Sequence, residues 1–255
     1  MLTSTLRERL RRQIDLKEMG PERQAAIAQT RFLVIGAGGI GSPALMYLAA
    51  SGAVNLIVAD HDGVSVSNLS RQLLHSAEDV GCNKAENTAR ALPRFNPEVR
   101  VTAIARCMST HAELCAVMAN ADVVLDCTDN LASRQLINRC AAELRKPLVF
   151  GSALRFSGQL SVFDFRDPNS PCYRCLFEDD VSENDQKAAQ YGVFTPITGL
   201  IGLLQASEAI KIAAGIGSSL VGRLLLVDLL TMDFQTIRFG KRRDCPVCSP
   251  SSVNG

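Results

Sequence analysis

Two pairs of cysteines offer a set of ligands for a metal ion. Cys172 and Cys175 form one Cys-x-x-Cys pair, and Cys245 and Cys248 form another. Four thiols grouped two and two are typical of a tetrahedral structural zinc site. The long segment between the pairs is compatible with one shared site, because the entropy of loop closure grows only logarithmically with length. A redox-active dithiol is the alternative interpretation of either pair.

A glycine-rich segment offers a second kind of chemistry, the binding of phosphate. Gly36, Gly38, Gly39 and Gly41 follow a short apolar run and open a segment with a helical pattern. Glycines permit a tight turn and a close backbone approach, and the start of the next helix presents free N–H groups to phosphate. Asp60 ends the next expected strand, where a carboxylate can bind ribose hydroxyls. Taken alone, this pattern also fits an NAD(P)-dependent oxidoreductase.

Charged residues further along the chain favour a triphosphate over a dinucleotide. Arg71 offers a bidentate fork and Lys84 a compact point charge, both shortly after Asp60. Asp129 lies just beyond another expected strand, at the edge where open α/β sheets bind ligands, and a carboxylate beside a triphosphate is a natural Mg²⁺ ligand. Asp129 could also cap the helix expected from residue 131, a role that is compatible with metal binding.

Alternating strands and helices are expected to position these residues. The apolar runs predict buried strands at 32–36, 55–60, 99–104, 121–126 and 147–150, with helices at 4–29, 40–51, 84–92 and 131–144. This alternation predicts a right-handed, mainly parallel sheet. Beyond residue 155 the pattern changes to strands with one exposed face at 159–165, 223–228 and 232–239, and a polar loop is expected at 178–186.

Composition narrows the class of protein. The chain has 255 residues, 47% of them hydrophobic, which suffices for one large α/β domain. A net charge of +1 gives no global field for nucleic acid or an anionic membrane. The apolar stretch 197–216 contains Gln205, Glu208 and Lys211, which favour a buried helix over a membrane span. Nine cysteines without a recognisable signal peptide predict a cytoplasmic location.

The remaining cysteines and the histidines are expected to have no ligand role. The histidines show no metal-ligand spacing, and the cysteines lie in or beside regular elements, where buried structural thiols are the usual case. The histidines are His61, His75 and His111, and the cysteines are Cys82, Cys107, Cys115, Cys127 and Cys140.

The order of these motifs resembles that of bacterial enzymes that activate ubiquitin-like sulfur carriers, relatives of the ubiquitin-activating enzymes. The resemblance spans nearly the whole chain. Within this family, the sequence is most similar to the molybdopterin-synthase adenylyltransferases, and its similarity to the thiamine-pathway enzymes is only slightly lower. Its fold would be Rossmann-like, with a mainly parallel sheet continued by antiparallel C-terminal strands and a zinc clip of four cysteines. The matching stretches are 12–13, 36–41, 60–72, 80–84, 126–130, 151–159, 199–211 and both cysteine pairs.

The resemblance implies ATP-dependent adenylylation of the C-terminal glycine carboxylate of a small sulfur-carrier protein. It implies ATP, Mg²⁺ and Zn²⁺ as cofactors, a homodimer, and a separate sulfur donor such as a cysteine desulfurase or rhodanese. Asp60 would hold the ribose, Arg71 and Lys84 the phosphates, and Asp129 the Mg²⁺. Arg12 would reach the phosphates from the partner subunit of the dimer. The nucleotide site would also include Ser67, Asn68, Gln72 and Asn130.

The resemblance also implies three parts of a single domain: N-terminal helices over 1–30, a nucleotide-binding part over 31–155, and a zinc-bearing, carrier-binding part over 156–255. Ser70 and the absence of a tyrosine before Arg12 are mild departures from the family pattern, and the larger departure lies in the crossover loop. Many relatives have a cysteine where this chain has Ala188. A covalent sulfur intermediate on that loop is therefore not expected, and the chemistry should stop at the acyl-adenylate. A non-catalytic scaffold that binds a ubiquitin-like partner is the remaining alternative.

Overall fold

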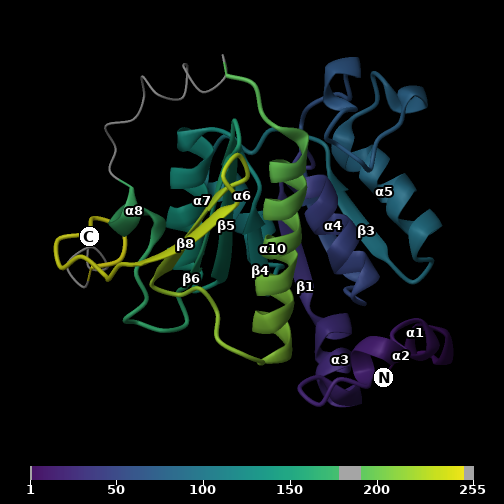
Figure 1. Cartoon of the computed structure of the whole chain (residues 1–255), viewed down its shortest axis with the longest axis horizontal. Helices are drawn as coiled ribbons and strands as arrows, with labels where there is room; N and C mark the ends of the chain where they lie inside the picture. Colours follow the sequence, from purple (N-terminus) through teal and green to yellow (C-terminus); the bar gives the residue numbers. More distant parts are fainter. Residues whose placement is uncertain (1, 178–190, 250–255) are drawn as a thin grey trace.

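One eight-stranded sheet runs through the protein, ordered β3-β2-β1-β4-β5-β6-β7-β8. The computed structural model describes residues 2–177 and 191–249 (Figure 1). The first five strands in this order pair in parallel, and the pairs from β5 to β8 are antiparallel, which confirms the predicted fold class. The strands are β1 (Arg31–Ile35), β2 (Asn55–Ala59), β3 (Arg100–Ile104), β4 (Val123–Asp126), β5 (Pro147–Leu154), β6 (Ser157–Asp164), β7 (Arg223–Asp228) and β8 (Asp233–Arg238).

The central parallel strands are buried on both faces, which explains their continuous apolar sequences. Phe32 and Val34 of β1 pack into one core, and Leu33 and Ile35 pack into the other. The first face is covered by α3 (Gly20–Gln29), α4 (Gly41–Ala50), α5 (Lys84–Phe95) and α10 (Thr195–Ala214). The second face is covered by α6 (His111–Met118), α7 (Leu131–Glu143) and α8 (Tyr173–Leu176).

The long apolar helix α10 is a core helix, as predicted. It is the one helix in the described ranges that is long and apolar enough to cross a bilayer, but half of its apolar window is buried. It packs against α4 and β5. Its fully buried Gln205 donates hydrogen bonds to the carbonyl groups of Asp126 (2.8 Å) and Val149 (3.0 Å). Gln205 thus fixes α10 to β4 and β5.

The structure contains elements that the sequence did not predict. Helices α6 and α8 were not expected, although Thr110 and Glu113 form a capping box that marks the start of α6. Strand β5 runs to Leu154, beyond the expected 147–150, because it continues into a hairpin with β6. The N-terminal helices are separate: α1 (Ser4–Arg9) and α2 (Arg11–Ile14) precede α3. The polar loop 178–186 and Ala188 lie outside the described residues.

Candidate functional site

A cleft of about 860 Å³ opens at the carboxyl ends of the parallel strands. The strand order reverses between β1 and β4, and this reversal is where doubly wound sheets bind ligands. The volume lies in the range of small-molecule and cofactor sites. Most of the predicted nucleotide-site residues line this cleft: Gly36, Gly38, Gly39, Asp60, Arg71, Gln72, Lys84, Asp129 and Asn130.

The glycine loop depends on the absence of side chains at two positions. Gly36 has φ +98°, and a Cβ there would lie 2.7 Å from the Cys127 carbonyl oxygen. A Cβ at Gly41 would lie 1.9 Å from the Gly36 carbonyl oxygen. Asp60 fixes the same loop, because its carboxylate accepts a hydrogen bond from the Ala37 N–H at 2.7 Å. The loop therefore stays open and close to the backbone of β4, as a cradle for phosphate requires.

Two predicted cations converge on this loop. The aliphatic part of Arg71 lies against Gly39, and its Nη1 donates to the Ser67 carbonyl at 3.0 Å. Lys84 is the first residue of α5, and its Nζ lies 2.9 Å from an Asp62 carboxylate oxygen. This hydrogen bond and charge hold the pKa of Asp62 below its usual value. Lys84 is buried while Asp62 is half exposed, so the ammonium group is held in place at the cleft.

A buried polar atom at the cleft remains without a partner in the described part of the chain. Gln72 is almost fully buried, and its Oε1 accepts no hydrogen bond there. Unpaired buried acceptors are costly, so such a group in a cleft suits a ligand that donates a hydrogen bond. The donor groups of a nucleotide meet this requirement, and the glycine cradle with its two cations fits the phosphates of ATP.

In the segment after β4, helix capping and metal binding fall to two different residues. Asn130 is the N-cap of α7 and accepts a hydrogen bond from the Ser133 N–H at 2.9 Å. The N-cap considered for Asp129 is therefore wrong by one residue. The Asp129 carboxylate is exposed at the cleft, which fits the oxygen donor that Mg²⁺ prefers. Asp126, by contrast, is buried beneath the cleft, and burial raises its pKa.

Four predicted site residues are absent from the lining of the cleft. Gly41 acts behind the loop, where it allows the close contact with Gly36. Ser67 and Asn68 belong to the short helix η1 (Val66–Asn68), and they support the next turn through their carbonyl groups, including the Ser67 contact with Arg71. Arg12 is exposed on α2. Figure 1 shows α2 near the amino ends of the parallel strands, whereas the cleft opens at their carboxyl ends. Arg12 does not reach the cleft of its own chain.

A third cation, Arg134, was not predicted from the sequence. It lies one turn into α7 and lines the cleft. Its Nη2 donates to the Thr128 carbonyl at 2.9 Å, its guanidinium stacks over Phe150, and its buried Nε has no partner among the described residues. The sequence does contain a signal for Arg134. It stands four residues after the Asn130 N-cap, on the same face of α7, and so it faces the end of β4 as Asn130 does. Arg106 and Arg155 also line the cleft.

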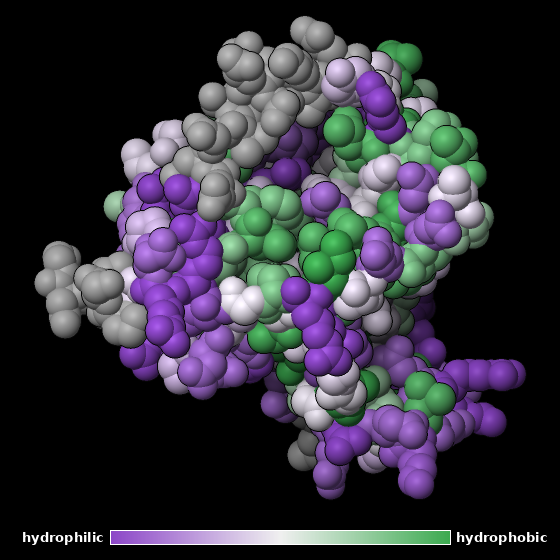
Figure 2. Space-filling model, turned by 60° about the vertical axis from the view of Figure 1, so that its left-hand side comes forward, coloured by the Kyte–Doolittle hydropathy of each residue, from purple (hydrophilic) through white to green (hydrophobic). Residues whose placement is uncertain are grey.

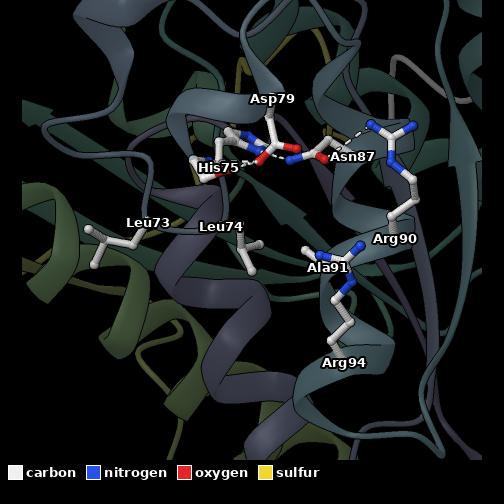
Figure 3. A pocket seen from close by; sticks show the side chains of 9 residues that line it. Leu73, Leu74, His75, Asp79, Asn87, Arg90, Ala91 and Arg94 are labelled. Atoms are coloured by element: carbon white, nitrogen blue, oxygen red, sulfur yellow. Dashed lines mark hydrogen bonds between the residues drawn. The ribbon is translucent and has the colours of Figure 1, made fainter.

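A buried histidine supports the glycine loop from behind. His75 Nε2 lies 3.2 Å from the Ala37 carbonyl, and its Nδ1 lies 2.9 Å from the Asn87 amide nitrogen. These partners require a neutral ring that donates through Nε2 and accepts through Nδ1. Burial lowers the pKa of His75, which favours this neutral form. Figure 3 shows His75, Asn87 and Asp79 turned toward one another beside a cavity of about 210 Å³.

The four predicted zinc ligands come together although the pairs lie 73 residues apart. Sulfur–sulfur distances are 3.5 Å between Cys172 and Cys245, 3.4 Å between Cys175 and Cys248, and 3.9 Å within the first pair. Zinc–sulfur bonds of about 2.3 Å place tetrahedral sulfurs about 3.8 Å apart, so the donor set fits zinc. The Arg242 N–H also points at the Cys175 sulfur, at 3.4 Å. These four residues are called the four-cysteine cluster below.

The five cysteines outside this cluster differ in burial. Cys127 and Cys140 are buried as expected, and Cys127 donates to Gln205 at 3.2 Å. Burial raises the pKa of Cys127 well above its usual value, which makes this thiol a poor nucleophile beside the cleft. Cys82 and Cys115 are only partly buried. The prediction of a buried thiol is wrong for Cys107, which is exposed.

Comparisons with known proteins agree over nearly the full chain. A model of the ThiF family matches residues 10–247. The chain is 42% identical over 240 residues to a molybdopterin-synthase adenylyltransferase of Escherichia coli (strain K12), covering 94% of this chain and 95% of that protein. It is 39% identical over 255 residues to a SAMP-activating enzyme E1 of Haloferax volcanii, covering 99% of this chain and 93% of that protein.

Solved structures share the fold at lower identity. A crystal structure of Escherichia coli MccB with ATP superposes with a TM-score of 0.79 and 22% identity, over 89% of this chain and 68% of that one. A structure of PaaA has the same TM-score, 0.79, with 20% identity over 94% of this chain and 76% of that one. At these identities the likeness concerns the fold.

Proposed function

Because the chain belongs to the ThiF family, we propose that it is an adenylyltransferase that uses ATP to activate the C-terminal glycine carboxylate of a small ubiquitin-like sulfur-carrier protein. The observation that carries this proposal is the gathering of Arg71, Lys84 and Arg134 with Asp129 around one glycine loop. Two phosphates of a dinucleotide can be met by backbone groups, whereas a triphosphate and its departing pyrophosphate need this additional positive charge.

The reaction requires positioning and charge stabilisation more than proton transfer. The carrier carboxylate is ionised at neutral pH, so its oxygen can attack the α-phosphorus without a general base. The bond from the α-phosphorus to the bridging oxygen breaks, and pyrophosphate leaves with its electron pair. Arg71 and Lys84 would stabilise the charge that develops on this leaving group. Mg²⁺ held by Asp129 would neutralise part of the phosphate charge.

The antiparallel half offers a surface for the carrier. Figure 2 shows apolar surface gathered on the side of the molecule that carries these strands. The exposed apolar side chains there lie on and before β8: Leu230, Met232, Phe234 and Ile237. Exposed apolar groups next to one another are a common feature of docking surfaces. This arrangement supports the assignment of residues 156–255 to zinc and carrier binding, beside a nucleotide part over 31–155 and N-terminal helices over 1–30.

Arg12 supports a homodimer as the active form. It cannot reach the cleft of its own chain, so a role at the phosphates requires a second copy of the chain. A molybdopterin-pathway carrier is the first candidate substrate because of the match to the Escherichia coli enzyme, and a thiamine-pathway carrier is the alternative. Sulfur would then come from a separate donor, such as a cysteine desulfurase or rhodanese, in the cytoplasm.

Exchange of labelled pyrophosphate into ATP tests the proposal. The purified chain should catalyse exchange only when a carrier that ends in Gly-Gly is present, and Asp129→Ala should reduce it at least about 100-fold. Glu86→Ala, which removes an exposed carboxylate of α5 outside the cleft, is the matched control and should retain exchange. If no carrier of either pathway supports exchange by the wild-type chain, the proposed function is wrong.

A further inference from the structure

A second cluster of metal-ligand side chains lies between α6 and α7. His111 and Cys115 are one turn apart on α6, and Cys140 lies on the facing helix α7. Their ligand atoms all lie within 4.8 Å of one another. Glu143, one turn beyond Cys140, adds a carboxylate oxygen 3.2 Å from the His111 Nε2. Imidazole and two thiols thus converge from two helices that pack together, and a carboxylate lies beside the imidazole.

The distance from the imidazole to the Cys115 thiol is close to one edge of a zinc tetrahedron. Zinc bonds of about 2.3 Å to sulfur and about 2.0 to 2.1 Å to nitrogen place the two donor atoms about 3.5 Å apart. The His111 Nδ1 lies 3.8 Å from the Cys115 sulfur, and the Nε2 of the same ring lies 3.2 Å from the Glu143 oxygen. The same comparison holds at the four-cysteine cluster, where the sulfurs lie 3.4 to 3.9 Å apart.

The cluster is anchored on one side and accessible on the other. Cys140 is fully buried, and its thiol lies 3.5 Å from the His111 carbonyl. The His111 and Glu143 side chains are 44% and 61% exposed, so an ion can enter from water. The capping box of Thr110 and Glu113 fixes the first turn of α6, which carries His111. A surface ion pair between His111 and Glu143 would by itself contribute little, and it does not account for two thiols at the same point.

We propose that His111, Cys115 and Cys140 bind a second thiophilic divalent cation, of the zinc class, that fastens α6 to α7, while Glu143 orients the His111 ring. Two sulfur donors and one nitrogen select zinc over Mg²⁺ or Ca²⁺. The site is separate from the four-cysteine cluster, and none of its four residues lines the nucleotide cleft. The site lies at the C-terminal end of α7, and Asn130 and Arg134 lie at the N-terminal end of the same helix. The ion would therefore fix the end of α7 that is remote from the cleft.

Zinc content of the full chain tests the proposal. After loading with zinc and removal of free metal, Cys115→Ala should contain one zinc ion fewer per chain than the wild type. Cys107→Ala, which removes an exposed cysteine outside the cluster, should contain the same number as the wild type. The number lost by Cys115→Ala is the readout, so the result does not depend on how fully the four-cysteine cluster is loaded. Equal zinc content in Cys115→Ala and the wild type would overturn the proposal.

A second variant keeps the test informative if Cys115→Ala does not fold. Glu143→Gln changes a largely exposed side chain and should fold normally. It should weaken the second site at least about 10-fold in zinc competition titrations, while the four-cysteine cluster keeps its affinity. Cobalt(II) can replace zinc, and the thiolate charge-transfer absorption of one of the two bound ions should disappear in His111→Ala. An unchanged cobalt spectrum and unchanged zinc affinity in both variants would contradict the proposal.

Discussion

The two halves of the sheet position their chemical groups by different means. In the parallel half, Gly36, Asp60 and Asp129 each follow the end of a strand, and parallel strands end at one edge. In the antiparallel half, β8 is an edge strand exposed along its whole length, and it contacts the rest of the sheet only through β7. The cysteine pair after β8 meets Cys172 and Cys175 across 73 residues.

This difference predicts where each half is sensitive to change. The backbone of the parallel half already places the cleft, so a substitution there should affect ligand binding and catalysis before it affects the rest of the protein. The antiparallel half has little buried surface at its edge, so its position should depend on the four-cysteine cluster. The two halves should therefore respond to different perturbations.

The largest effect is expected from Gly41→Ala, which disrupts the parallel half directly. The new Cβ would lie 1.9 Å from the Gly36 carbonyl oxygen, so the glycine loop must move. ATP affinity measured by calorimetry should fall at least about 100-fold, and the free energy of unfolding should fall by about 3 kcal/mol. Gly199→Ala on α10 is the control, because its Cβ meets no atom within 4 Å. ATP binding by Gly41→Ala at wild-type strength would show that the loop does not organise the cleft.

Removing one charge from the intact cleft should affect catalysis alone. Lys84→Met keeps the apolar stem of the side chain but removes the ammonium group that Asp62 holds at 2.9 Å. Pyrophosphate exchange should fall by about 100- to 1000-fold. The melting temperature should change little, because the half-exposed Asp62 carboxylate can be hydrated. Lys17→Met, at an exposed position outside the cleft, should retain full exchange activity. If Lys84→Met retained as much exchange as Lys17→Met, Lys84 would have no part in the mechanism.

The residues that the sequence could predict are those placed by local structure. The glycine loop, Asp60 and Lys84 each adjoin an element whose type is readable from a short window, and the cysteine pairs follow a fixed spacing. Arg134 and His75 were missed because their roles depend on which way a side chain points after packing. Cys140 meets His111 only because α6 packs on α7, a tertiary contact that no spacing encodes. The N-cap at Asn130 instead of Asp129 reflects the usual one-residue uncertainty of helix ends.

A perturbation of the antiparallel half should spare the cleft region of the sheet. Cys175→Ser removes one sulfur of the four-cysteine cluster, and the free energy of unfolding should fall by roughly 3 kcal/mol, or about 6 to 12 °C in Tm. Hydrogen exchange should accelerate in β7 and β8 and stay unchanged in β1 and β4. Cys107→Ser, at an exposed thiol outside the cluster, controls for the loss of a cysteine. Equal acceleration across all eight strands would mean that the halves are not independent.

The smallest effect concerns the buried histidine behind the glycine loop, and it appears only at acidic pH. Burial lowers the pKa of His75 in the folded protein. The hydrogen bond with the Ala37 backbone and the charges of Asp79 and Asp60 oppose this shift, and Lys84 adds to it. The unfolded chain therefore binds a proton more readily, starting near the ordinary value of 6.5. Stability from this residue is complete above that pH and is lost as the pH falls toward the lower folded pKa.

The slope of stability against pH isolates this contribution. Below about pH 6.5 the free energy of unfolding should fall by up to about 1.4 kcal/mol per pH unit through His75 alone. His75→Gln cannot take up the proton, yet its amide can still donate to the Ala37 carbonyl and accept from Asn87. Denaturant titrations should therefore show a flatter acid slope for His75→Gln than for the wild type, with native ATP affinity at pH 7.5. Equal acid slopes in the two proteins would mean that the glycine loop tolerates a charged imidazole at position 75. The parallel half of the sheet would then depend less on His75 than its geometry indicates.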